Sequence, residues 1–301
     1  MSIQIITKFH AYLLTEKMVS LNTFSAYKRD IDQFVHYLTN QKKEITAIEI
    51  DDVKSYVYIL KEQLHLTARS ITRKISALKV LFLYLQEHHG GVNLAQDLIF
   101  PKLEKKLPQY LSEEQVKQLL QAAEHDTGEH KERNKLLLYL LYVTGMRISE
   151  LISLQLSHLH FDTGILQVKG KGGKTRMIPV PAPIMQLIKE YIMRDHQKFT
   201  QTSDRQTEYL FPIFYGGVIK HITRQAVWFI LKQLCKRSGI DQSIFPHQLR
   251  HSLATHMLKN GADLRSLQLL LGHENVSTVQ VYTHLETSYL REIYDKKHPR
   301  S

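Results

Sequence analysis

The chain has 301 residues and a formal net charge of +11, from 40 lysines and arginines against 29 aspartates and glutamates. This length is more typical of two domains than of one, and the positive charge favours a polyanionic partner without requiring it. The single cysteine, Cys235, excludes a disulfide scaffold and a cysteine-based zinc site, and it favours a reducing cytoplasm. No run reaches the ~18 apolar residues of a membrane span, and the first residues lack the pattern of a signal peptide.

Residues 1–90 predict a small helical domain. Apolar side chains recur at helical spacing in two of its segments, at Tyr27, Ile31, Phe34 and Leu38 and at Ile71, Ile75, Leu78, Phe82 and Leu85. Asn22 or Thr23 is the expected N-cap of the first of these helices. Helices near residues 3–18 and 49–63 complete a four-helix unit.

Two of these helices carry basic residues on the side opposite their apolar stripe. Lys28 and Arg29 lie on the earlier helix, and the later one carries Arg69, Arg73, Lys74 and Lys79. Such charges are most often a solvated helix face, but two basic faces in one small domain also suit contacts with phosphates.

The string GGVNLAQDLIFPKLEKKLPQY contains two glycines and two prolines without a clear period, and it predicts a linker over residues 91–110. A second domain then covers residues 111–301. It begins with Ser112 ahead of an acidic first turn and continues with a long helix around residues 131–144. A further helix through ISELISL follows Gly145, and Cys235 is expected in the core of this domain.

The segment GILQVKGKGGKTRMIPVP predicts a β-hairpin, with Ile165, Gln167 and Lys169 alternating into a glycine-rich turn. Lys171 lies in that turn, where it could donate a proton to a leaving 5′ oxygen. GGKT resembles the end of a nucleotide-binding P-loop, but Val168 stands where the first glycine should be, so we reject that interpretation.

The remaining chemistry lies in TGMRISEL, FPHQLRH and LLGHENVSTVQVYTH. Arg147 and Arg250 can hold a phosphodiester from two sides, because a guanidinium pairs bidentately with phosphate oxygens and stays charged. His247 and His273 can donate hydrogen bonds to that phosphate or move a proton. Tyr282 can attack it only within a cationic pocket, because a phenol has a pKa of about 10. Taken singly, each has an ordinary structural explanation.

Two other histidines, His251 and His256, lie near this set. We expect them to pack or cap, because the H-E-x-x-H pattern is absent and no carboxylate lies between them. The sequence therefore predicts no metal site and no cofactor.

Together these motifs resemble the tyrosine recombinase (phage integrase) family over almost the whole chain. The family pattern of Arg, hairpin Lys, H-x-x-R, His or Trp, and Tyr has every member present. It falls on Arg147, Lys171, His247, Arg250, His273 and Tyr282. The resemblance implies a mainly α fold with a small β-sheet, in which a four-helix, SAM-like core-binding domain precedes a mixed α/β catalytic domain.

The resemblance also implies a mechanism. Tyr282 would attack the scissile phosphate and form a 3′-phosphotyrosyl link while Lys171 protonates the leaving oxygen, and the reaction would need neither metal nor ATP. The C-terminal tail would be exchanged between protomers. The expected DNA contacts are Lys28, Arg69, Arg73, Arg224 and Gln225.

Within the family, the chain resembles the Xer recombinases. That resemblance implies a nucleoid-associated enzyme that resolves chromosome dimers at dif-like sites during cell division. Its partners would be double-stranded DNA, a paralogue such as XerC in a heterotetramer, and a DNA translocase such as FtsK. Three alternatives remain open: an integrase of a mobile element, a topoisomerase-like nicking enzyme and a DNA-binding protein without catalysis.

Overall fold

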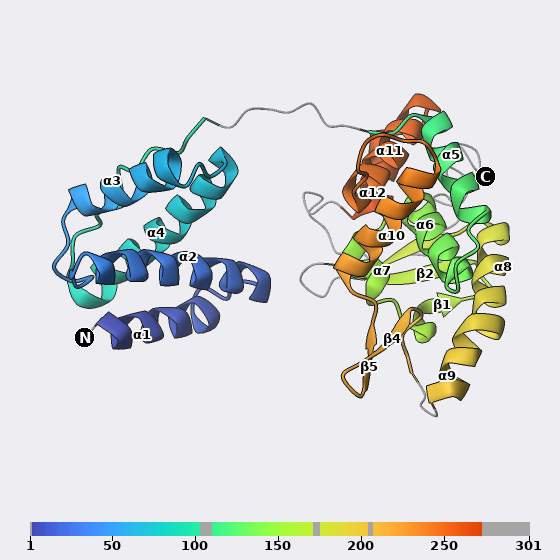
Figure 1. The fold of residues 1–301 in the computed structure, drawn as a ribbon, viewed down its shortest axis with the longest axis horizontal. Coiled ribbons are helices and arrows are strands. Elements are labelled where there is room, and N and C mark those ends of the chain that lie inside the picture. Colours follow the sequence, from blue (N-terminus) through green and yellow to red (C-terminus); the bar gives the residue numbers. More distant parts are fainter. Residues whose placement is uncertain (1, 103–109, 171–174, 204–206, 273–301) are drawn as a thin grey trace. The chain divides into compact units, whose positions relative to one another are not determined.

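The computed structural model describes residues 2–102, 110–170, 175–203 and 207–272. The chain divides into two compact units, Met1–Lys106 and Leu107–Ser301, each with its own hydrophobic core. Figure 1 shows the elements of each unit. Among the described residues, no helix is both long enough and apolar enough to cross a membrane.

The first unit is the expected four-helix arrangement. Its elements are α1 (Ser2–Thr15), α2 (Leu21–Asn40), α3 (Ile50–Tyr58) with a π-helical continuation η1 (Ile59–Gln63), and α4 (Ala68–His89). The apolar stripes predicted on α2 and α4 face inward, and Phe34, Leu78 and Phe82 are almost fully buried. Ser20 caps α2 by accepting a hydrogen bond from the Thr23 amide at 3.2 Å, so the expected N-cap at Asn22 or Thr23 was wrong.

One lysine of the expected basic face of α4 is buried instead. Lys74 is 6% exposed, and its Nζ donates to Asp30 Oδ1 at 2.9 Å and to Gln33. Arg73 also pairs with Asp30, so a buried carboxylate from α2 holds two cations of α4. A buried charge requires such partners, which periodicity alone does not reveal.

The chain after α4 still belongs to the first unit. Gly90 ends the helix in the left-handed conformation. Ala95, which falls within the range 91–110 expected to be a linker, is fully buried in the first core, and Leu94 and Leu98 pack against that core. The first core therefore extends beyond the helices that the sequence pattern indicated.

The second unit is mainly helical with two small sheets. Its helices are α5 (Glu113–Glu124), α6 (Lys131–Thr144), α7 (Ile148–Ile152), η2 (Leu156–His158), α8 (Ala182–Tyr191), η4 (Ile192–His196), α9 (Gln197–Ser203), α10 (Arg224–Arg237), α11 (Pro246–Lys259) and α12 (Leu264–Leu271). Its strands are β1 (Leu159–His160), β2 (Ile165–Lys169), β3 (Thr175–Pro179), β4 (Pro212–Tyr215) and β5 (Val218–His221). The order β1-β2-β3 forms an antiparallel sheet, and β4-β5 forms a separate hairpin.

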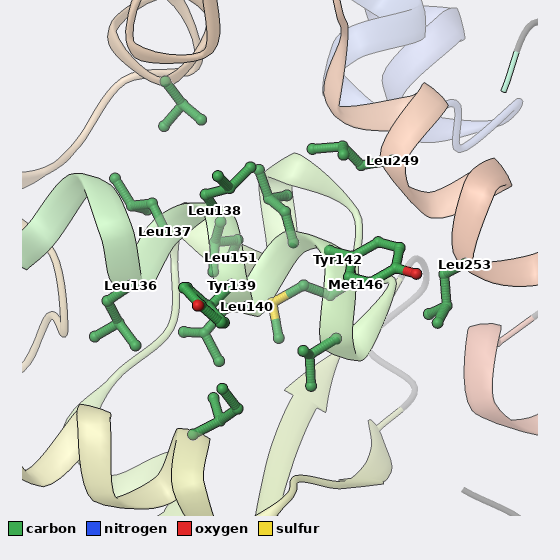
Figure 2. Packing of buried hydrophobic residues seen from close by; sticks show 14 of the residues in the cluster. Leu136, Leu137, Leu138, Tyr139, Leu140, Tyr142, Met146, Leu151, Leu249 and Leu253 are labelled. Atoms are coloured by element: carbon green, nitrogen blue, oxygen red, sulfur yellow. The ribbon is translucent and has the colours of Figure 1, made fainter. Parts of the chain in front are cut away.

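Helix α6 lies at the centre of this unit. Every residue from 136 to 144 is buried, and α5, α7, α8, α10 and α11 pack around it. Figure 2 shows buried side chains of α6 together with Leu151 of α7 and with Leu249 and Leu253 of α11. A helix that is apolar on all sides is stable only inside a core. Cys235 is buried in the same core, as expected.

The hairpin of β2 and β3 has the predicted strands, and the structure adds which of its faces is buried. Leu166 and Val168 are buried, and their partners across the antiparallel ladder are Ile178 and Arg176. Ile165, Gln167 and Lys169 point to the opposite face. The run Ile-Leu-Gln-Val-Lys places apolar residues on both faces of the strand. Alternation alone therefore cannot decide which face packs against the core.

Candidate functional site

Three of the six expected catalytic residues, Arg147, His247 and Arg250, lie in the described part of the second unit. Lys171, His273 and Tyr282 lie outside the described residues. Gly272, the last described residue, immediately precedes His273 in the sequence.

Arg147 is placed by a sharp change of direction between two helices. Helix α6 ends at Gly145, which has a φ of +58°, and α7 begins directly after Arg147. A Cβ on Gly145 would lie 2.7 Å from a methyl group of Leu271 on α12 and 2.8 Å from one of Leu253 on α11. Only glycine therefore fits at this position beside α11 and α12. The tight turn at Gly145 therefore determines the position of Arg147 at the start of α7.

Glu150 fixes both ends of Arg147. The backbone N–H of Arg147 donates to Glu150 Oε2 at 2.8 Å, and Nη1 donates to Oε1 at 3.0 Å. The Arg147 side chain is 40% exposed, whereas that of Glu150 is 3% exposed. A buried carboxylate thus anchors an arginine whose head group reaches solvent.

Arg250 comes from α11 and is 5% exposed. Its Nη1 donates to the carbonyl of Gly145 at 2.6 Å, and its Nη2 donates to the carbonyl of Leu271 at 2.5 Å. It therefore joins the end of α6 to the end of α12.

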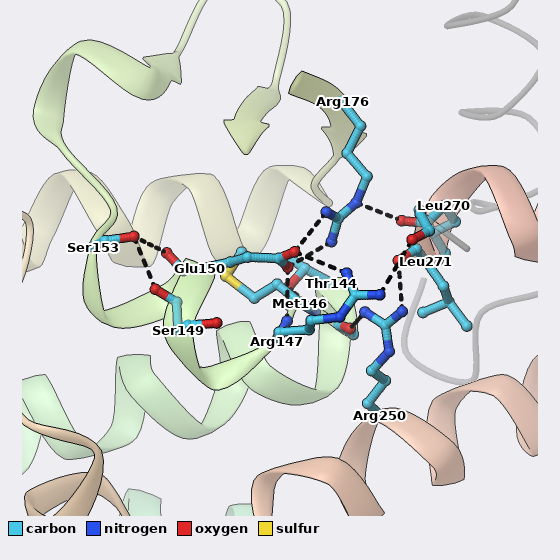
Figure 3. Close-up of polar contacts among 12 residues, drawn as sticks. Thr144, Met146, Arg147, Ser149, Glu150, Ser153, Arg176, Arg250, Leu270 and Leu271 are labelled. Carbon is cyan, nitrogen blue, oxygen red and sulfur yellow. Dashed lines mark hydrogen bonds and ion pairs between the residues drawn. The ribbon is translucent and has the colours of Figure 1, made fainter. Parts of the chain in front are cut away.

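The end of α12 is bound by three arginines from three different elements (Figure 3). The carbonyl of Leu270 accepts from Arg176 at 3.1 Å, that of Leu271 from Arg250, and that of Gly272 from Arg147 at 3.2 Å. The last carbonyls of a helix lack intrahelical partners and carry the negative end of the helix dipole. They are therefore suitable acceptors for this group of cations.

Sequence reasoning missed two members of this network, Glu150 and Arg176. Arg176 donates from Nη1 and Nη2 to the two carboxylate oxygens of Glu150 at 2.9 and 2.8 Å. A signal for Glu150 was present, since an acidic residue three positions after Arg147 can bond back at a helix start. The signal for Arg176 was weaker. It consists only of the spacing that places Arg176 on the same strand face as the apolar residue Ile178, which indicates that Arg176 could be buried.

The electrostatics of the network follow from burial and from these charges. Burial opposes ionisation of Glu150, but the hydrogen bonds and charge of Arg176, followed by the contacts of Arg147, outweigh it and lower the pKa of that carboxyl below its ordinary value of 4.5. Burial, followed by the positive charges of Arg147 and Arg176, lowers the pKa of Arg250 to about 10. Arg250 therefore remains charged near neutral pH, in a setting that favours binding of an anion.

His247 lies on α11, one turn before Arg250, and is exposed. The side chain is exposed, but the protein around it removes part of the water from the imidazole, and this partial desolvation and the nearby charge of Arg250 lower its pKa below the ordinary value of 6.5. It is therefore mainly neutral near neutral pH in the absence of an anion, and it can donate one hydrogen bond and accept another.

The other histidines of α11 have structural roles. His256 is 1% exposed, with Nε2 2.9 Å from the carbonyl of Leu111 and Nδ1 3.0 Å from the hydroxyl of Tyr142. His251 packs edge-on against Tyr110. Among residues 2–102, 110–170, 175–203 and 207–272, no group of three His, Cys, Asp or Glu side chains is placed to hold a metal ion.

The five expected DNA-contact residues fall in both units. Arg69 is exposed near the start of α4, Arg73 is bound to Asp30, and Lys28 pairs with Asp32 at 2.6 Å. Arg224 and Gln225 are exposed in the first turn of α10, where Thr223 caps the helix by accepting from the Ala226 amide at 3.1 Å. The N-terminus of that helix provides further N–H groups and a positive dipole end, which suit a phosphate.

The described geometry suits the binding of a phosphodiester. Arg147 and Arg250 meet at one helix end, and the contacts among the described residues use only part of their N–H donors. Two guanidinium groups held by carbonyls and a carboxylate are already ordered before an anion arrives, which is the condition for strong electrostatic stabilisation of a transition state.

Comparison with known proteins extends these observations. Residues 109–288 match the phage integrase family, and residues 6–89 match the phage integrase N-terminal SAM-like domain. The chain is 38% identical over 299 residues to tyrosine recombinase XerD of Oceanobacillus iheyensis, covering 98% of each protein. It is 36% identical over 302 residues to XerD of Listeria monocytogenes, covering 99% of each.

The chain is also similar to a XerC protein and, in its fold, to a solved recombinase structure. Tyrosine recombinase XerC of Oceanobacillus iheyensis is 36% identical over 299 residues. The fold is similar, with a TM-score of 0.70, to a XerH recombinase bound to its difH substrate in a pre-cleavage complex, at 21% identity and covering 98% of this chain and 82% of that one.

Proposed function

The chain belongs to the phage integrase family of tyrosine recombinases, and from that premise we propose that it cuts and rejoins DNA through a 3′-phosphotyrosyl intermediate on Tyr282. The observation that carries this proposal is the meeting of Arg147 and Arg250 at the end of α12, directly before His273 in the sequence. A protein that only binds DNA does not need two guanidinium groups ordered against the same helix end.

The chemistry proceeds by in-line displacement at phosphorus. The phenolic oxygen of Tyr282 attacks the scissile phosphate and gives up its proton to His247 or His273, the bond to the 5′ oxygen breaks, and Lys171 supplies the proton that this oxygen takes up. Arg147 and Arg250 stabilise the charge on the non-bridging oxygens, with His247 and His273 as further hydrogen-bond donors. The 5′ hydroxyl of a partner strand then attacks the phosphotyrosine and restores the DNA backbone.

This chemistry requires neither a metal nor ATP, because the phosphotyrosyl bond retains the energy of the broken phosphodiester. Arginines supply the charge neutralisation that a metal ion supplies in other phosphoryl-transfer enzymes. Side chains of the protein therefore carry out the whole reaction.

DNA contacts are proposed for Lys28, Arg69 and Arg73 in the first unit and for Arg224 and Gln225 in the second. The positions of the last two at a capped helix N-terminus support this assignment. We further propose that the target is a dif-like site and that the working complex is a heterotetramer with a XerC-like paralogue. In the cytoplasm it would resolve chromosome dimers at the nucleoid, where a DNA translocase such as FtsK would activate it.

The proposal is tested by trapping the covalent intermediate. The protein is incubated with EDTA, without ATP, on a nicked suicide duplex carrying a dif-like site, with and without the paralogue. We expect a protein–DNA species that survives denaturation and disappears in Tyr282→Phe. Tyr215→Phe, at a 72% exposed tyrosine of β4, is the matched control and should leave the species unchanged. Specific binding without any covalent species, even with the paralogue present, would reject catalysis in favour of a binding protein.

A further inference from the structure

We propose that Arg176 is a positioning residue for the cleavage step. It bonds to the carboxylate of Glu150, which anchors Arg147, and it also bonds to the C-terminal end of α12, which orients both Arg147 and Arg250. This inference rests on the proposed function. Arg176 itself is 5% exposed, so it acts through its neighbours rather than by touching DNA.

The location of Arg176 is unusual for an arginine. It lies on the buried face of the β2–β3 hairpin, where its ladder partner is Val168 and the next residue on the same face is Ile178. Burying a guanidinium is costly unless every part of it is paired. Its Nη1 and Nη2 pair with both oxygens of Glu150, and its Nε pairs with the Leu270 carbonyl at 3.1 Å.

These contacts link both catalytic arginines. Glu150 is shared, since its oxygens also accept from the backbone and side chain of Arg147. The Leu270 carbonyl directly precedes the carbonyls of Leu271 and Gly272 that accept from Arg250 and Arg147. Arg176 therefore holds one carboxylate and one helix end that together fix the direction of Arg147.

The close packing around Arg176 argues that the contact is specific. A Cβ added to Gly272 would lie 3.0 Å from Cδ and 3.2 Å from Nε of Arg176, so the side chain lies directly against the backbone of the helix end. A lysine at position 176 would keep the charge but could not bond both Glu150 oxygens and the Leu270 carbonyl in one plane. We therefore expect Arg176→Lys to keep the fold while loosening the positions of Arg147 and Arg250.

Small displacements of groups that bind a reacting phosphate are costly. A shift of about 1 Å in a positioning group can cost on the order of 100-fold in rate. Binding of the DNA outside the site should change little, because Arg176 is buried. The expected signature of Arg176→Lys is therefore slow cleavage with nearly normal affinity for the DNA site.

The experiment compares two suicide duplexes in single-turnover cleavage by the full-length protein with its paralogue. One duplex has the native scissile phosphate. The other has a methylphosphonate there, in which a methyl group replaces one non-bridging oxygen and removes the negative charge that the arginines neutralise. Urea unfolding, followed by fluorescence of Trp228, reports whether each variant is folded.

For Arg176→Lys we expect a loss of cleavage on the order of 10- to 100-fold on the native phosphate and a loss about tenfold smaller on the methylphosphonate. The matched control is Arg237→Lys, since Arg237 of α10 also pairs with a buried carboxylate, Asp126, away from the catalytic arginines. It should leave the ratio of the two cleavage rates unchanged.

The outcomes separate the inference from the proposed function. Wild-type protein that forms no covalent species on either duplex would refute the proposed function. Wild-type cleavage combined with an equal loss on both duplexes in Arg176→Lys would overturn the positioning role, since a general structural defect does not depend on the charge of the phosphate. Full activity of Arg176→Lys on both duplexes would also overturn it.

Discussion

At the scale of single residues, the site depends on one buried carboxylate that binds two arginines. Glu150 accepts from Arg147 and Arg176, and burial alone would favour its neutral form. The arginines reverse that preference, so the network is stable only while the carboxylate is charged. This arrangement makes the stability of the second unit depend on pH.

Glu150→Gln should lower the unfolding free energy of the second unit by about 3 kcal/mol near neutral pH, because two arginines lose their carboxylate partner. The pKa of the Glu150 carboxyl is lower in the folded than in the unfolded chain, so its stabilisation is complete above its ordinary value of 4.5 and is lost as the pH falls through the lower folded value. The difference between wild type and variant should therefore narrow as the solution is acidified. Urea unfolding across a pH series measures it.

The control for this series is Glu114→Gln, which makes the same substitution at an exposed position on α5. It should change the stability little at any pH. If the unfolding free energies of wild type and Glu150→Gln differed by the same amount at neutral and at acidic pH, the charge of Glu150 would not be what stabilises the unit.

Residue identities could be predicted from the sequence only where a pattern marks them. The string TGMRISEL and the H-x-x-R spacing pointed to Arg147, His247 and Arg250, and the structure brings Arg147 and Arg250 to one helix end. Arg176 could not be found in this way. Its role comes from the three-dimensional meeting of a strand face with two helix ends, which no local spacing encodes.

At the scale of elements, helices with one apolar stripe, such as α2 and α4, were predictable from the spacing of their apolar residues, although the capping residue of α2 was not. Helix α6 occupies Lys131–Thr144, as its pattern indicated, and the β2–β3 strands follow the expected hairpin. The buried face of that hairpin was not predictable, because β2 carries apolar residues on both of its faces. Which face is buried is decided by the elements that pack against it.

Gly145→Ala should destabilise the second unit by more than backbone strain alone. A non-glycine residue at positive φ costs roughly 1–2 kcal/mol, and here the new methyl group would also collide with Leu271 and Leu253. Gly239→Ala is the control, because Gly239 has a φ of +72° and nothing within 4 Å of an added Cβ. Denaturation should show a loss about 1–3 kcal/mol larger for Gly145→Ala. Equal losses would mean that the helices around Gly145 move apart without cost.

At the scale of the whole molecule, the two units have separate cores and can be followed separately. The first core contains Phe34 and Phe82, and the second contains Leu140 and Leu253. The only tryptophan of the chain, Trp228, lies on α10 in the second unit. Its fluorescence therefore reports on one unit, whereas far-UV circular dichroism reports on the helices of both.

Phe34→Ala should destabilise the first unit by about 3–5 kcal/mol, because it removes a fully buried aromatic ring. We expect the transition seen by circular dichroism to split or to begin at lower urea, while the transition seen by Trp228 fluorescence stays in place. Leu140→Ala should shift the fluorescence transition instead. If Phe34→Ala moved the fluorescence transition by a similar amount, the two cores would have to unfold as one cooperative unit.

The way the three arginines bind α12 restricts how this protein can change over evolutionary time. The acceptors are main-chain carbonyls of Leu270, Leu271 and Gly272, so the contacts themselves place little demand on the side chains at the first two positions. Length is a different matter, since inserting or deleting one residue in α12 would turn its last carbonyls by about 100°. Lineages of this chain should therefore drift in the exposed amino acids of α12 while keeping its number of residues.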